Sequence, residues 1–93
     1  MAEAVVESLE TRHAQRIRAG NHVIIADEPP ANGGGDKGPS PYELLLSALG
    51  ACKSITVRMY ADLKKIPLSG VKLRLSHRKV DAEEGQGKVD LIE

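Results

Sequence analysis

Cys52 is the residue whose side chain points most directly to a chemical reaction. A thiol is a nucleophile in its thiolate form, which requires a nearby cation or the N-terminus of a helix. Cys52 lies about twelve residues into a predicted helix, beyond the end effect of the helix dipole. Lys53 and Arg58 lie about 100° and 120° around that helix from Cys52, so the cation has to come from another element. The alternative is that Cys52 is a small buried apolar residue, which is common for unpaired cysteines.

Candidates for that cation lie on a predicted N-terminal hairpin, of this chain or of a second subunit: Arg12, Arg16 and Arg18. Glu43 is a candidate for the carboxylate that holds such an arginine. It precedes Cys52 by nine residues, about 13.5 Å along the helix axis and on the opposite side, so the two side chains cannot meet within one helix. A role in capping the helix also explains Glu43 fully.

Other chemistry finds little support in the sequence. The three histidines, His13, His22 and His77, lack the spacing of metal ligands and have no second cysteine to join them. The glycine-rich stretch 33–38 lacks the Gly-Lys-Ser/Thr ending of a phosphate-binding loop. We therefore expect no metal and no cofactor.

The helix that carries Cys52 has a clear start. Ser40 is a suitable N-cap, Pro41 suits the first helical position, and Glu43 completes a capping box. The pattern predicts one helix of about 24 residues that ends near Lys65. Gly50 in its interior costs about 1 kcal/mol relative to alanine, which predicts that another group approaches the helix there.

The apolar surface of this helix exceeds what so short a chain can cover. One face contains Leu45, Leu49, Cys52, Thr56, Met59 and Leu63, and further apolar residues lie beside it, so burial on more than one side is expected. The 93 residues form one domain at most and include no Phe or Trp. We therefore predict a homodimer that packs two such helices between two sheets.

The remaining elements are predicted to be short strands. Residues 4–10, 15–19 and 22–26 read as an antiparallel meander, followed by a loop over 27–38. Residues 71–79 alternate apolar and polar side chains and predict a strand, 81–85 an acidic turn, and 88–92 a return strand. The predicted fold is α+β, with residues 1–93 as a single domain in which an antiparallel sheet of short strands packs on one long central helix.

Charge and composition exclude several classes of partner. Thirteen basic and thirteen acidic residues are dispersed, so neither nucleic acid nor an anionic membrane is expected as a partner. The N-terminus lacks the apolar run of a signal peptide. A single cysteine excludes an internal disulfide framework and suits a reducing compartment, so a cytoplasmic protein is expected.

The sequence resembles the OsmC/Ohr family of hydroperoxide-reducing proteins, and in particular its OsmC-like branch of less certain function. The similarity extends over nearly the whole chain. It rests on Asp27-Glu28-Pro29, Gly34-Gly35, the run from Gly38 to Leu46, Ala48-Leu49-Gly50-Ala51-Cys52, Arg58-Met59-Tyr60-Ala61, Leu68-Ser69-Gly70-Val71 and His77.

The resemblance implies an α+β fold and an intertwined homodimer with its sites at the subunit interface. It also implies that Cys52 matches the peroxidatic cysteine, which attacks the O–O bond of an organic hydroperoxide and becomes a sulfenic acid. The family's activating arginine comes from the N-terminal hairpin, where Arg12 is the nearest match.

Two positions depart from the family pattern. The second, resolving cysteine of the family lies on a later helix, and this sequence contains no second cysteine. The chain resembles about the N-terminal two-thirds of the usual domain. The carboxylate that partners the arginine lies ten residues before the cysteine, where this chain has Tyr42, and Glu43 is one step away. We therefore expect either an OsmC-like thiol peroxidase that relies on an external thiol reductant, or a non-catalytic dimeric module that binds a small molecule or has a structural role.

Overall fold

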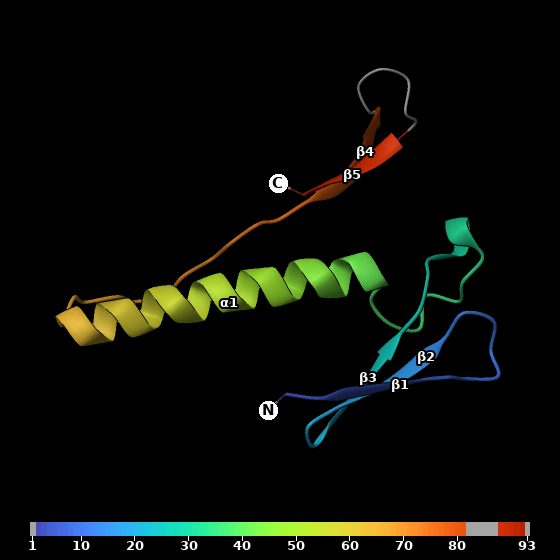
Figure 1. Cartoon of the computed structure of the whole chain (residues 1–93), viewed down its shortest axis with the longest axis horizontal. Helices are drawn as coiled ribbons and strands as arrows, with labels where there is room; N and C mark the ends of the chain where they lie inside the picture. Colours follow the sequence, from blue (N-terminus) through green and yellow to red (C-terminus); the bar gives the residue numbers. More distant parts are fainter. Residues whose placement is uncertain (1, 82–87, 93) are drawn as a thin grey trace. The chain divides into compact units, whose positions relative to one another are not determined.

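The computed structural model describes residues 2–81 and 88–92 of the chain. These residues form a three-stranded antiparallel sheet, one long helix and a two-stranded hairpin, which confirms the predicted α+β class (Figure 1). The chain divides into two compact units, Met1–Leu44 and Leu45–Glu93, and each is described by itself. The single domain over residues 1–93 and the packing of the sheet on the helix stay predictions.

The first unit contains the predicted meander. Strands β1 (Ala4–Ser8), β2 (Gln15–Ala19) and β3 (His22–Ala26) pair antiparallel in the order β1-β2-β3. Ile17 is paired with Val6 on one side and Ile24 on the other, so three β-branched side chains form a row across one face. β1 ends two residues before the predicted boundary, because the chain turns from Leu9, whose N–H donates to the carbonyl of Ala14.

Helix α1 begins and ends with complete capping motifs. It extends over Pro41–Lys64, 24 residues, as the sequence predicted. At its start the Ser40 N–H donates to Glu43 Oε1 (2.9 Å) and the Glu43 N–H donates to Ser40 Oγ (3.2 Å), which is the predicted capping box. At its end the Ile66 N–H bonds to Ala61 O and the Lys65 N–H to Asp62 O, the Schellman pattern, with Lys65 in the left-handed region at φ 56°.

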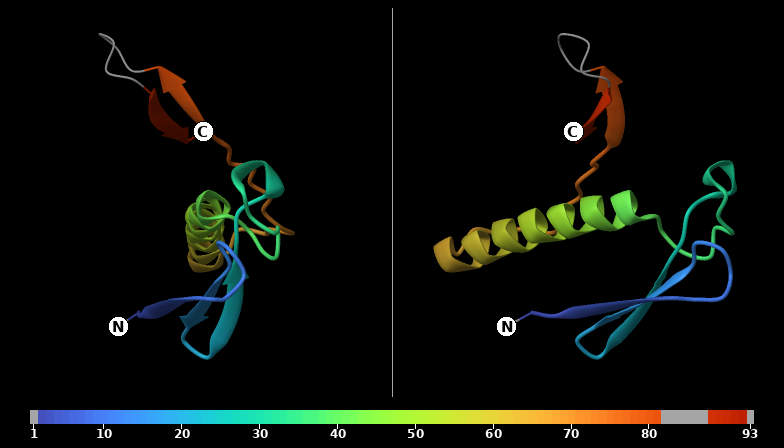
Figure 2. Two further views of the ribbon diagram at one scale, coloured as in Figure 1. Left: turned by 90° about the vertical axis from the view of Figure 1, so that its right-hand side faces the viewer. Right: turned by 45° about the vertical axis from the view of Figure 1, so that its right-hand side comes forward.

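The segment after α1 differs from the prediction. Residues 66–76 turn back and run along α1 as an extended chain, which Figure 2 also shows, and strand β4 begins only at His77 (His77–Asp81). The predicted strand 71–79 is therefore wrong for residues 71–76. The reason is that β5 (Lys88–Ile92) pairs only with residues 77–81, so among the described residues no strand pairs with residues 71–76. Most of the acidic turn predicted at 81–85 lies outside the described residues.

A side chain of this extended segment explains Gly50. A β-carbon built on Gly50 would lie 3.1 Å from Cδ1 of Leu75, tighter than ordinary van der Waals contact. The predicted approach of another group to this glycine is thereby confirmed. On the same helix, the guanidinium of Arg58 donates to the carbonyl of Leu68 (3.1 Å), which fixes the start of the returning segment.

Little apolar surface is covered within the chain. Among the described residues only Ala14, Ala26, Ala61 and Asp27 are buried, and Ala61 is the only buried residue of α1. Large apolar side chains of α1 are exposed, among them Met59 (65 %) and Leu63 (77 %). Among the described residues of the second unit, none provides the expected burial of α1 on more than one side.

Replacing Lys65 with glycine should stabilise the protein. A left-handed non-glycine residue costs roughly 1–2 kcal/mol, and the greater freedom of unfolded glycine offsets about 0.5–1 kcal/mol of that cost. We expect Lys65→Gly to raise the free energy of unfolding by up to about 1 kcal/mol in urea denaturation. Lys64→Gly, one residue earlier and still helical, is the matched control and should lower it by up to about 1 kcal/mol. Equal effects of the two variants would contradict this account.

Candidate functional site

Cys52 lies in the middle of α1, and its side chain is exposed within the chain. Residues three or four positions away share its face of the helix. On that face, Leu49 (38 % exposed) precedes Cys52, and Thr56 follows one turn later and donates its hydroxyl to the carbonyl of Cys52 (2.8 Å). Met59 continues the face by two turns. The thiol is therefore accessible and is set in an otherwise mostly apolar surface.

The predicted arginines of the N-terminal hairpin are found in different situations. Arg12 is exposed in the turn between β1 and β2, where its φ of 45° is left-handed. Arg16 pairs with Glu7 (3.2 Å) across the strands, an exposed pair that contributes little to stability. Arg18 and Arg12 make no ion pair within the part of the chain that the structure describes. Both are available to a thiolate or to another anion.

The structure does not bring the three predicted catalytic residues together in one unit. Arg12 and Glu43 belong to the first unit, and Cys52 belongs to the second. Glu43 forms the capping box at the start of α1, so its helix-capping role is confirmed. The catalytic arrangement of Cys52, Arg12 and Glu43 stays a prediction.

The best-organised polar group of the first unit is the carboxylate of Asp27, which sequence reasoning missed. Asp27 follows β3 directly and is 2 % exposed. Its Oδ1 accepts the N–H of Glu28 (2.7 Å), and its Oδ2 accepts the N–H groups of Gly35 and Lys37 (3.2 Å each). An aspartate at the end of a strand before a glycine-rich loop was the available signal, because Asp often accepts nearby backbone N–H groups.

The surroundings of Asp27 favour its charged form. Burial alone would raise the pKa of the carboxyl group, but the three backbone hydrogen bonds and the nearby imidazole of His13 outweigh it and lower that pKa below its usual value. The carboxylate therefore acts as an acceptor that closes the loop of residues 27–39. With all three donors supplied by the backbone, its structural role is satisfied without a ligand.

Two glycines let the same loop pack against the end of β3. A β-carbon on Gly34 would overlap the carbonyl of Glu28, and one on Gly38 would overlap the carbonyl of Ile25. The Asp36 N–H donates to Glu28 O and the Asp27 N–H to Pro39 O (3.1 Å each), so backbone lies directly on backbone. These bonds place Pro39 and hence the capping box that follows it.

A small cavity of about 260 Å³ lies beside Asp27, lined by polar and apolar residues of the first unit that include His13, Glu28, Ala26 and Pro41. Within the described residues, no group of three or more His, Cys, Asp or Glu side chains is placed to hold a metal ion. Nor does any described helix combine the length and apolarity needed to cross a membrane.

Comparison with models of protein families decides which family the chain belongs to. The family model described as "OsmC-like protein" matches residues 33–92, well over half of the 93-residue chain. The chain belongs to the OsmC-like protein family. A search of the curated proteins and a search of the solved structures gave no match. The matched region of this OsmC-like protein contains Cys52 and Glu43, whereas Arg12 lies outside it.

Alanine in place of Gly38 should disrupt the loop of the OsmC-like protein. The new methyl group would overlap the Ile25 carbonyl, which belongs to a paired strand and cannot move alone. We expect Gly38→Ala to lower the melting temperature by several degrees. Gly70→Ala is the matched control, because a β-carbon there meets nothing within 4 Å, and its melting temperature should be unchanged or slightly higher. Similar losses for both variants would show that the close approach is not what matters.

The carboxylate of Asp27 should make stability depend on pH in the acid range. Because its pKa is lower in the folded protein than the unperturbed 3.8, the folded state binds fewer protons there, and stability falls as pH drops below about 3.8. Asp27→Asn removes this titration and leaves two amide protons facing backbone donors. We expect it to melt earlier at pH 7 and to show a flatter loss of stability between pH 4 and pH 2, measured by circular dichroism. Parallel pH curves for the variant and the wild type would contradict the assignment.

Proposed function

We propose that this OsmC-like protein reduces organic hydroperoxides and that Cys52 is the nucleophile. The observation that carries the proposal is an exposed cysteine on the central helix, within the region that matches the family. A peroxiredoxin-like role is the general expectation for this family. The apolar neighbours Leu49 and Met59 on the same helix face suit a substrate with an organic group better than a small polar one.

The proposed reaction has three balanced steps. The Cys52 thiolate attacks the distal oxygen of ROOH, an S–O bond forms as the O–O bond breaks, and the leaving alkoxide takes a proton to become ROH. A thiol then attacks the sulfenic sulfur, which gives a mixed disulfide and water. A second thiol releases the oxidised reductant and restores the Cys52 thiolate. The sequence contains one cysteine, so both reducing thiols are external in this proposal.

A cation is needed beside the thiolate, and we assign this role to Arg12. Its side chain is exposed and makes no ion pair among the described residues, so no structural task competes with catalysis. Glu43 is the proposed carboxylate that orients this arginine, in addition to its capping role. Arg18 serves as a comparison, since it is also exposed but lies within strand β2 rather than in the turn.

The active form is proposed to be a homodimer. The exposed side chains along α1, including Leu45 (44 %), Met59 (65 %) and Leu63 (77 %), form more apolar surface than a helix of a monomer usually leaves uncovered. A second copy would bury this surface, exclude water around Cys52 and supply an arginine from its own hairpin. The organic hydroperoxide and the thiol reductant are the remaining partners of the reaction.

Substitution of Cys52 and Arg12 tests the proposal. With cumene hydroperoxide and dithiothreitol, the wild type should consume peroxide and Cys52→Ser should lose this activity completely. Arg12→Gln should lower kcat/KM by about a hundredfold, the scale expected for removing one charge-stabilising group. Arg18→Gln is the control for loss of a nearby positive charge and should keep most of the activity.

The alternative is a non-catalytic dimeric module in which Cys52 only packs. That function would be favoured if the folded wild type forms no sulfenic acid with cumene or tert-butyl hydroperoxide, detected by a dimedone adduct in mass spectrometry. It would also be favoured if Cys52→Ser kept the peroxide consumption of the wild type. Size-exclusion chromatography of Cys52→Ser distinguishes loss of chemistry from loss of the assembly.

A further inference from the structure

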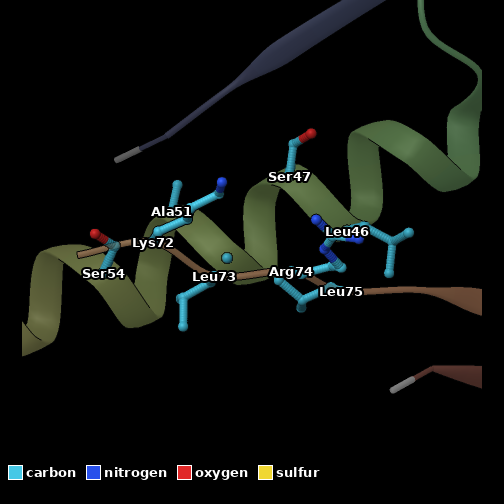
Figure 3. Close-up of a pocket in the computed structure, with 9 residues that line it drawn as sticks. Leu46, Ser47, Ala51, Ser54, Lys72, Leu73, Arg74 and Leu75 are labelled. Atoms are coloured by element: carbon cyan, nitrogen blue, oxygen red, sulfur yellow. The ribbon is translucent and has the colours of Figure 1, made fainter.

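The cavities of the structure differ in whether they adjoin the proposed catalytic residues. A groove of about 480 Å³ in the second unit is lined by residues of α1 and by residues 72–75, and it includes none of the proposed catalytic residues (Figure 3). The cavity of about 260 Å³ in the first unit is lined by His13, the neighbour of Arg12, and by Pro41, two residues before Glu43. The segments that carry these two catalytic residues thus meet at the smaller cavity.

The turn between β1 and β2, which contains Arg12, has a defined backbone conformation. Ala14 is 2 % exposed, its N–H donates to Thr11 O, and its carbonyl accepts the N–H of Leu9 (2.9 Å each). Arg12 lies between these bonds with φ 45°, in the left-handed region that a non-glycine residue occupies only when its surroundings hold it there. The direction in which the Arg12 side chain leaves the turn therefore depends on what the turn packs against.

His13 connects this turn to the loop of residues 27–39. Its side chain is exposed but lies against Gly33, because a β-carbon on Gly33 would be 3.3 Å from Nε2 and 3.8 Å from Cδ2 of the ring. The imidazole is also near enough to the Asp27 carboxylate for the two charges to attract when the ring is protonated. Because the same loop leads into the capping box of α1, the ring links the turn of Arg12 to the start of the helix.

We propose that His13 is a positioning residue, whose ring lies on Gly33 and holds the β1–β2 turn so that the Arg12 guanidinium keeps a fixed place for the Cys52 thiolate. This inference rests on the proposed peroxide chemistry and adds the residue that determines where Arg12 lies. His13 itself touches neither the substrate nor the sulfur. A misplacement of about 1 Å can lower a catalytic rate by about a hundredfold, so the loss of this contact should be measurable.

Gly33→Ala tests the contact without any reaction. The new methyl group would meet the His13 ring, so the amide NMR resonances of Arg12 and Ala14 should shift, although residue 33 belongs to another segment. Gly20→Ala is the matched control, because Gly20 is also left-handed (φ 62°, against 88° at Gly33) but a β-carbon there meets nothing within 4 Å. In a His13→Ala background, Gly33→Ala should no longer shift these resonances. Equal shifts with and without the imidazole, or no shift at all, would overturn the inference.

A double-mutant cycle tests whether His13 acts through Arg12. With cumene hydroperoxide and dithiothreitol, His13→Ala should lower kcat/KM about tenfold. His13→Gln, whose amide can take the place of Nε2, should keep most of the activity. In the Arg12→Gln background, His13→Ala should change kcat/KM less than about twofold, because the group that it positions is already absent. His22→Ala removes an exposed histidine at the start of β3, outside the cavity, and should match the wild type.

The outcomes separate this inference from the function on which it rests. If His13→Ala lowers kcat/KM by the same factor with and without Arg12, or leaves it unchanged in both backgrounds, the inference is overturned and the peroxidase function is not. If the wild type consumes no peroxide, or if Arg12→Gln is as active as the wild type, the proposed function fails, and the inference fails with it.

Discussion

The stability of α1 in this OsmC-like protein depends on how much of the helix's apolar surface is covered by other residues. A 24-residue helix in water is stabilised mainly by packing of its apolar faces. Against the residues that the structure describes, Ala61 is the only buried residue of that helix, while Met59 and Leu63 remain largely exposed. The environment of Cys52 therefore depends on what covers these side chains, which in the proposed homodimer is the second copy.

Local hydrogen bonds, by contrast, are well satisfied. The capping box at Ser40 and the Schellman pattern at Lys65 fix both ends of α1 within the chain itself. The carboxylate of Asp27 accepts three backbone N–H groups and so closes the loop of residues 27–39 that leads into α1. The position of Cys52 along the helix is thus set by local contacts, even though its surroundings are not.

Much of the fold was predictable because its signals are local. Ser40, Pro41 and Glu43 marked the start of α1, and the turn at residues 20–21 marked the meander. Residues 71–76 were mispredicted because an alternating pattern describes a capacity to pair, and pairing depends on a neighbour that the sequence pattern does not supply. Asp27 was missed for a related reason, since its partners Gly35 and Lys37 are defined only once the loop folds back.

The candidate site was predictable only in part. Cys52 was identifiable from its residue type and its place in the helix, and the family match includes it. The cation expected beside the Cys52 thiolate was not identifiable, because Arg12, Arg16 and Arg18 share one hairpin and their spacing does not distinguish them. The structure adds one observation that bears on the choice among these three arginines: Arg16 is already paired with Glu7.

The hydrogen bond from the Asp27 N–H to the Pro39 carbonyl joins the two ends of the segment between β3 and α1. When the two ends of a loop are hydrogen-bonded to each other, the number of residues between them has little effect on the positions of the strand and the helix that the loop connects. Insertions or deletions near Pro30–Asn32, which lie between the two bonded ends, would leave the start of the helix in place. The connection is therefore where homologous chains are free to differ in residue number while keeping the same helix entry.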